Sequence, residues 1–105
     1  MIPLIHQSDF EAEVLQSPIP VIVDYGSATC GKCKMLSPTI DRIAAEFAGV
    51  AKVVKVSVDT DMPLAQLYKV TMLPTLHFFK GGELRHTIIN IATKENIVSH
   101  LRELL

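Results

Sequence analysis

The 105-residue sequence has no tryptophan, only two cysteines and no excess of either charge, with ten Lys/Arg against eleven Asp/Glu. Two cysteines are too few for a disulfide-rich scaffold. A net charge of −1 argues against nucleic-acid binding, which needs a basic patch or stripe. No apolar run approaches the ~18 residues of a membrane span. We therefore expect neither a nucleic-acid partner nor a membrane partner.

What the chain does have is a hydrophobic content of 49%, which indicates a buried core rather than a disordered chain. The length suits one domain, covering residues 1–105. The N-terminal residues lack the basic region and cleavage pattern of a secretory signal. We therefore expect a cytoplasmic monomer, and in that compartment a cysteine pair is more often catalytic, redox-active or metal-binding than structural.

Strand and helix patterns alternate along the chain. Residues 21–25 and 53–58 are continuous β-branched runs, typical of strands covered on both faces. Leu36, Ile40, Ile43 and Phe47 lie at helical spacing. Further strands are expected at 3–6, 76–79 and 83–91, and further helices at 8–16, 62–68 and after 93. The order βαβαβαββα predicts an α/β fold, with a central mixed five-stranded sheet flanked by four helices.

Capping residues are predicted at three helix ends. Ser8 and Glu11 have the spacing of a capping box at the start of the first helix. Asp61 is the expected N-cap of the third helix. Gly49 is the expected C-cap of the second helix.

The sequence Cys30-Gly31-Lys32-Cys33 lies between a predicted strand and a predicted helix. Two intervening residues let the sulfurs meet within one helical turn, so a reversible disulfide is possible. Cys30 falls at the helix start, where unpaired N–H groups stabilise a thiolate. Such motifs lower cysteine pKa values from ~8.5 toward 3.5–7.5. Lys32 and Lys34 add positive charge that acts in the same direction.

Other uses of the cysteine pair remain open. A zinc site normally has four ligands, and the chain has no second CxxC motif. Its histidines, at positions 6, 77, 86 and 100, show no ligand spacing, so we expect no metal site within one chain. Metal or cluster binding across a dimer remains an alternative, as do two inert cysteines. A CxxC motif beside a βαβ unit favours redox chemistry.

Six parts of the chain match segments of one family, all in the same order: residues 21–25, 30–35, Pro38, 56–59, 73–75 and 79–82. Along nearly its whole length the sequence therefore resembles thioredoxin. The resemblance implies a thioredoxin fold and a thiol–disulfide oxidoreductase that reduces disulfide-containing protein substrates. It also implies recycling by a separate reductase, commonly an NADPH-dependent flavoprotein, so the chain itself needs no cofactor.

The resemblance also implies roles for individual residues. Cys30 is matched to the nucleophile and Cys33 to the resolving thiol. Asp24 is matched to a buried carboxylate that helps to move the Cys33 proton, and Lys55 to its neighbour on the adjacent strand. An acid that follows residues 21–23 would be desolvated, which raises its pKa unless a cation offsets the burial. The alternatives are a solvated Asp24 at a strand end and a Lys55 that extends to the surface.

Substrate binding is implied for Gly31 and Lys32 in the motif and for Leu73 and Pro74. The last two match the cis-proline segment of the family. If the bond is cis, the Leu73 backbone can pair with an extended substrate strand. An ordinary turn before a strand is the alternative interpretation of Pro74.

Five positions depart from the thioredoxin pattern: Gly26 and Thr29 replace tryptophans, Lys32 a proline, Met72 a small residue and Asn90 a glycine. All five surround the expected active-site face, so we expect unusual partners. Lys32 should favour the reduced form and raise the redox potential above the roughly −270 mV of ordinary thioredoxin. An oxidase or isomerase, a non-catalytic binding module and a metal-binding protein are the competing hypotheses.

Overall fold

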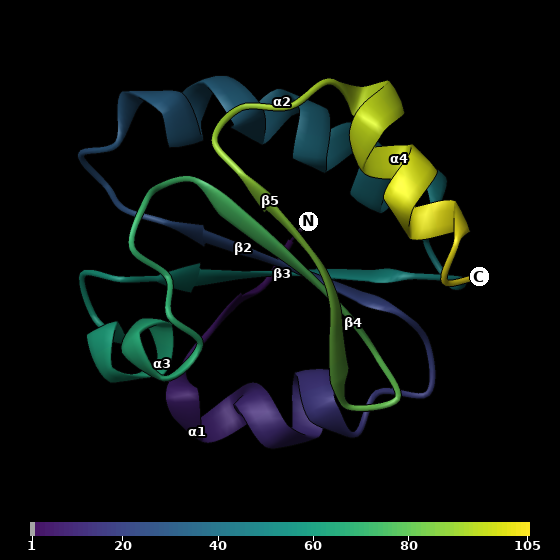
Figure 1. The fold of residues 1–105 in the computed structure, drawn as a ribbon, viewed down its shortest axis with the longest axis horizontal. Helices are drawn as coiled ribbons and strands as arrows, with labels where there is room; N and C mark the ends of the chain where they lie inside the picture. Colours follow the sequence, from purple (N-terminus) through teal and green to yellow (C-terminus); the bar gives the residue numbers. More distant parts are fainter. Residues whose placement is uncertain (1) are drawn as a thin grey trace.

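The computed structural model describes residues 2–105, so Met1 of the predicted domain lies outside the described residues. Helices cover both faces of a five-stranded sheet (Figure 1). The strands are β1 (Leu4–Ile5), β2 (Val21–Gly26), β3 (Lys52–Ser57), β4 (Thr75–Lys80) and β5 (Glu83–Ile89). The helices are α1 (Gln7–Phe10), its π-helical continuation η1 (Glu11–Leu15), α2 (Gly31–Glu46), α3 (Met62–Leu67) and α4 (Lys94–Arg102).

The sheet is mixed, with the strand order β1-β3-β2-β4-β5. Strands β1, β3 and β2 are parallel, whereas β4 runs antiparallel to β2 and β5 antiparallel to β4. The hairpin turn between β4 and β5 consists of Gly81 and Gly82, both with positive φ, as a type I′ turn requires. The predicted α/β fold and its element order are confirmed.

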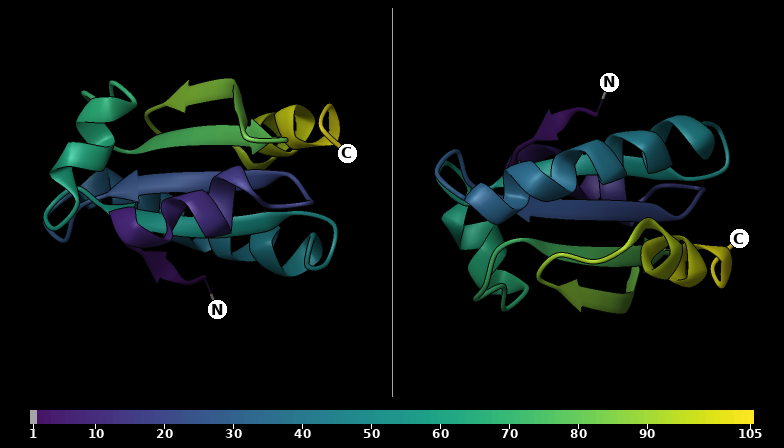
Figure 2. Two further views of the ribbon diagram at one scale, coloured as in Figure 1. Left: turned by 90° about the horizontal axis from the view of Figure 1, so that it is seen from below. Right: turned by 90° about the horizontal axis from the view of Figure 1, so that it is seen from above.

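Two apolar cores fill the spaces between the sheet and its helices. From one side of the sheet α2 and α4 are in front, and from the other side α1 is (Figure 2). The α2 stripe of Leu36, Ile40, Ile43 and Phe47 is buried in the first core. The second core contains Phe10, Val14, Leu64 and Ala65, from the helices of the opposite face. Strand β2 is buried on both faces because it lies in the middle of the sheet.

The predicted capping box at Ser8 is wrong. The N-cap of helix α1 is His6, two residues before Ser8, and the helix begins at Gln7. The Asp9 carboxylate accepts a hydrogen bond from the His6 backbone N–H at 3.0 Å. A second carboxylate, that of Asp61, accepts from the backbone N–H of Gln7 at 2.9 Å. These two carboxylates hold the helix start at His6, because a charged acceptor binds a backbone N–H more strongly than a hydroxyl does.

The other two predicted helix ends are partly corrected. Asp61 does occupy the N-cap position of α3, but its side chain makes no cap hydrogen bond there. It bonds instead to α1 and, at 2.9 Å, to the His6 ring. Helix α2 ends at Glu46 with Phe47 as its C-cap. Gly49 lies in the turn that follows, with a φ of 87°.

The length and hydropathy of the helices bear on membrane insertion. Among the residues described, no helix has both the length and the apolar character needed to cross a bilayer.

Candidate active site

The two cysteines lie at the start of α2, where the chain leaves the sheet after β2. Cys30 is the N-cap of this 16-residue helix, and its Sγ accepts a hydrogen bond from the Cys33 backbone N–H at 3.2 Å. The two sulfurs form a disulfide, with the Cα atoms 5.3 Å apart. Cys30 therefore occupies the position where the unpaired N–H groups and the positive end of the helix dipole meet its sulfur.

Asp59 holds the loop that leads into this helix. Its carboxylate accepts from the Ala28 backbone N–H at 2.9 Å and from the Ser27 hydroxyl at 3.0 Å. No local sequence signal predicted this role for Asp59, although it lies just after β3, whose parallel neighbour β2 ends at the same edge of the sheet. That placement is the signal by which this residue could have been found.

Asp24 and Lys55 lie side by side in the sheet, paired in the parallel register of β2 and β3. Asp24 is only 7% exposed, so the alternative of a solvated strand end is wrong. Burial raises the pKa of Asp24 to about 6, although the positive charge of Lys55 opposes the shift and the negative charge of Asp41 adds to it. Lys55 is half-buried and donates a hydrogen bond to the Ser37 hydroxyl at 3.2 Å.

The peptide bond between Leu73 and Pro74 is cis, as the resemblance implied. Pro74 is buried and directly precedes β4, whose first residue, Thr75, pairs with Tyr25 near the end of β2. The cis bond therefore lies at the same end of the sheet as the loop that carries the cysteines. Gly31 and Lys32 are exposed on the first turn of α2.

Asn90, which stands where the family pattern has glycine, adopts a left-handed backbone conformation. Its φ is 79°, and asparagine adopts this left-handed region more readily than most residues. The Asn90 backbone N–H donates to the Pro74 carbonyl at 2.8 Å. This departure from the family pattern therefore leaves the backbone beside Pro74 tethered. Met72 is 54% exposed, and nothing in the structure explains its presence.

A pocket of about 490 Å³ lies beside Cys33. It brings together three of the predicted site residues, Cys33, Asp24 and Lys55, whereas Leu73 and Pro74 lie outside it. Gly26 also forms part of the wall, at a position where thioredoxins usually have tryptophan. The remaining lining residues among those described are Leu4, Ser27, Ala28, Lys34, Ser37, Val56 and Ser57.

A mixed five-stranded sheet with a CxxC disulfide at the start of a helix, and a cis-proline at the same end of the sheet, defines the class of dithiol–disulfide exchange proteins. The thioredoxin family model matches residues 2–103. Thioredoxin of Rickettsia felis is 38% identical over 96 residues, which cover 91% of each chain. Thioredoxin of Synechocystis sp. is 34% identical over 103 residues, which cover 98% of this chain and 96% of the relative.

A third relative, named thioredoxin M4, chloroplastic, of Arabidopsis thaliana, is 33% identical over 99% of this chain and 54% of its own length. The chain belongs to the thioredoxin family. It is a thiol–disulfide oxidoreductase of the protein-disulfide reductase type.

Proposed function

We propose that Cys30 attacks the disulfide of a protein substrate and that Cys33 resolves the mixed disulfide. The observation that carries this assignment is the position of Cys30 as the N-cap of α2, where its sulfur accepts the Cys33 N–H. The helix N-terminus stabilises the Cys30 thiolate, which is the attacking species. In the first step the substrate disulfide breaks, a bond forms to Cys30, and one substrate sulfur leaves as a thiolate.

In the second step the Cys33 thiolate attacks the Cys30 sulfur. The second substrate sulfur leaves, and the protein keeps the Cys30–Cys33 disulfide, so the substrate gains two electrons. Cys33 must lose its proton for this step, and Asp24 is the proposed acceptor. Its burial, its place on the wall of the same pocket and its pKa of about 6 support that role. Lys55 is the proposed positioning residue that moderates the charge of Asp24.

The substrates proposed are disulfide-containing proteins, bound along Gly31, Lys32, Leu73 and Pro74. An extended substrate strand would pair with the Leu73 backbone, which gives affinity with little sequence specificity. We also propose a monomer that works in the cytoplasm, needs no cofactor of its own and takes electrons from a separate donor, such as a reductase.

Reduction of insulin disulfides, driven by dithiothreitol, tests the assignment. Wild-type protein should accelerate the reaction, and both Cys30→Ser and Cys33→Ser should abolish turnover. The Cys33→Ser variant should accumulate a stable mixed disulfide with insulin through Cys30. Turnover that survives either substitution would contradict the mechanism. Stoichiometric zinc or iron in an inactive purified protein would favour the metal-binding alternative.

The redox potential tests the role proposed for Lys32. Equilibration with glutathione should give a potential above the roughly −270 mV of ordinary thioredoxin, because positive charge near the sulfurs favours the thiolate form. The variant Lys32→Pro should lower the potential. A wild-type value more negative than that of thioredoxin would refute this part of the proposal.

A further inference from the structure

The glycine at position 26 leaves space beside the Cys33 sulfur, because it has no side chain. A Cβ atom added to Gly26 would lie 3.5 Å from Cys33 Sγ, in ordinary van der Waals contact. The approximately 490 Å³ pocket begins at this place and includes both residues in its wall. Cys30 is not among the described residues that line it. A small molecule in the pocket would therefore approach Cys33 from a side that Cys30 does not occupy.

The two sulfurs of the disulfide differ as targets for an attacking thiolate. Attack at Cys33 expels the Cys30 thiolate, which the start of α2 stabilises. A thiol of lower pKa is the better leaving group in such exchange. Attack at Cys33 is thus the chemically favoured direction wherever its sulfur can be reached.

The pocket wall also indicates the kind of thiol that fits. Lys34 and Lys55 contribute two cationic side chains, against the single carboxyl group of Asp24. Hydroxyl groups of Ser27, Ser37 and Ser57 add hydrogen-bonding groups to the wall. We propose that a low-molecular-weight thiol carrying a carboxylate enters this pocket and reduces the protein by attacking Cys33. The proposal rests on the proposed function and adds a second route for electrons to reach the same disulfide.

The electron balance has two steps. The small thiolate forms a bond to Cys33 Sγ, the Cys30–Cys33 bond breaks, and its electron pair remains on Cys30 as a thiolate. A second small thiolate then attacks the sulfur of the first, which releases a small-molecule disulfide and the Cys33 thiolate. The protein gains two electrons, and two small thiols are oxidised to one disulfide.

A pair of matched variants tests this route. Gly26→Leu places a side chain in the pocket, and Thr29→Leu places the same side chain on an exposed residue next to Cys30. The oxidised proteins are reduced by 3-mercaptopropionate or by neutral 2-mercaptoethanol, with rates expressed per thiolate. We expect Gly26→Leu to slow reduction by mercaptopropionate at least tenfold more than Thr29→Leu does. We expect wild-type protein to react faster with the carboxylated thiol.

The site of attack is read by acid quenching, alkylation and peptide mapping. An adduct on Cys33 supports the proposal, and an adduct confined to Cys30, or equal rates for the two leucine variants, would overturn it. Single-turnover reduction of insulin by pre-reduced wild-type protein distinguishes a failure of the proposed function from a failure of the small-thiol route. If that reaction fails, the proposed function fails. If it succeeds while the adduct maps to Cys30, only the small-thiol route fails.

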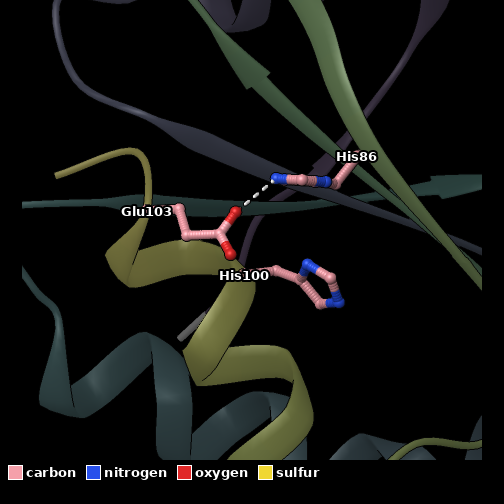
Figure 3. A group of neighbouring side chains, drawn as sticks. All are labelled: His86, His100 and Glu103. Carbon is pink, nitrogen blue, oxygen red and sulfur yellow. Dashed lines mark hydrogen bonds and ion pairs between the residues drawn. The ribbon is translucent and has the colours of Figure 1, made fainter.

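A second, independent observation concerns three side chains between β5 and α4. His86 from β5 converges with His100 and Glu103 from the end of α4 (Figure 3). The His86 Nε2 atom lies 3.0 Å from the Glu103 carboxylate, and one potential ligand atom from each residue lies within 4.8 Å of the others. The His100 Nδ1 atom is buried and, within residues 2–105, has no hydrogen-bond partner.

Two imidazoles and a carboxylate are a ligand set that Zn²⁺ and similar divalent transition ions prefer. An ion would also satisfy the buried nitrogen of His100, which otherwise costs free energy. We infer that His86, His100 and Glu103 bind one such ion, with water completing the coordination. The Glu103 side chain is 58% exposed, so it is free to draw inward to bonding distance.

Zinc binding to the oxidised protein tests this site, because the disulfide withholds both cysteines from the metal. Calorimetry should give one Zn²⁺ per chain, with a rise in melting temperature. His100→Ala and Glu103→Gln should each weaken binding at least tenfold, because each removes or neutralises a ligand. His6→Ala is the matched control, since His6 is exposed and is already paired with Asp61. No binding, or affinity unchanged in His100→Ala, would overturn the inference.

Discussion

Asp24 on strand β2 and His77 on strand β4 are buried titratable side chains in the middle of the sheet, and they face opposite cores. Asp24 lies on the same face of the sheet as Ile22, which is the face that α2 covers. His77 packs against Tyr25, Tyr68 and Phe79 on the other face. Burial favours the neutral form of both groups. It therefore raises the pKa of Asp24 to about 6 and lowers the pKa of His77 to about 4.

The surroundings distinguish Asp24, the proposed proton acceptor, from His77. Asp24 borders a pocket whose wall also includes Cys33 and Lys55. His77 is 3% exposed, and its Nδ1 pairs with the Tyr25 hydroxyl at 3.2 Å, inside a cluster of aromatic rings. A perturbed pKa alone therefore does not define a site, and access to a reactive atom decides which group does chemistry.

The rate of insulin reduction should show the largest difference between substitutions at Asp24 and at His77. Asp24→Asn should slow insulin reduction about 100-fold at pH 7, because general-base assistance contributes about 10²–10⁴-fold. His77→Asn is the matched control on the opposite face, and its rate should stay within about twofold of wild type. A loss of rate in His77→Asn as large as that in Asp24→Asn would show that Asp24 has no special role in the reaction.

The same substitution, Asp24→Asn, should increase stability although it slows the reaction. At pH 8 Asp24→Asn should raise the free energy of unfolding by about 2–3 kcal/mol, because it removes a buried charge whose pKa shift spans about two units. Urea unfolding of the oxidised protein measures this change. Asp41→Asn, an exposed carboxylate on α2, is the control and should change stability by less than about 0.5 kcal/mol. A destabilised Asp24→Asn would contradict the assignment.

The pH dependence of stability should also distinguish Asp24 from His77. The folded pKa of Asp24 is raised, so its contribution to stability falls as the pH rises from about 4 to about 6. The folded pKa of His77 is lowered, so its contribution rises between about 4 and 6.5. Relative to wild type, Asp24→Asn should therefore gain stability with rising pH, and His77→Asn should lose it. Urea titrations at pH 4.5, 5.5 and 6.5 should show the two opposite slopes, and slopes of the same sign would refute this prediction.

The smallest effect should come from the hydrogen bond within the aromatic cluster. Tyr25→Phe removes the partner of His77 Nδ1 and should cost about 1 kcal/mol. Thermal unfolding measures the loss, and insulin reduction should be unchanged because the hydroxyl lies on the face away from Cys33. A loss of activity would show that the two faces are coupled.

Much of the fold was predictable because its signals are local. The α2 stripe from Leu36 to Phe47, the β-branched strands and the paired glycines of the hairpin each act within a few residues. The helix ends were less predictable. Ser8 has a capping spacing, but Asp61, which is distant in the sequence, supplies a carboxylate that moves the helix start to His6.

The order and spacing of residues determined the class of protein and the cysteine pair at the start of α2, because neighbours along the chain set the geometry of Cys30 and Cys33. Which distant groups surround that pair depends on the packing of the whole chain. The register of β2 with β3 places Asp24 beside Lys55. Packing leaves the space at Gly26 open to Cys33. Packing also brings His86 to the end of α4. Contacts between remote residues depend on how strands and helices pack and not on the spacing of the residues in the sequence.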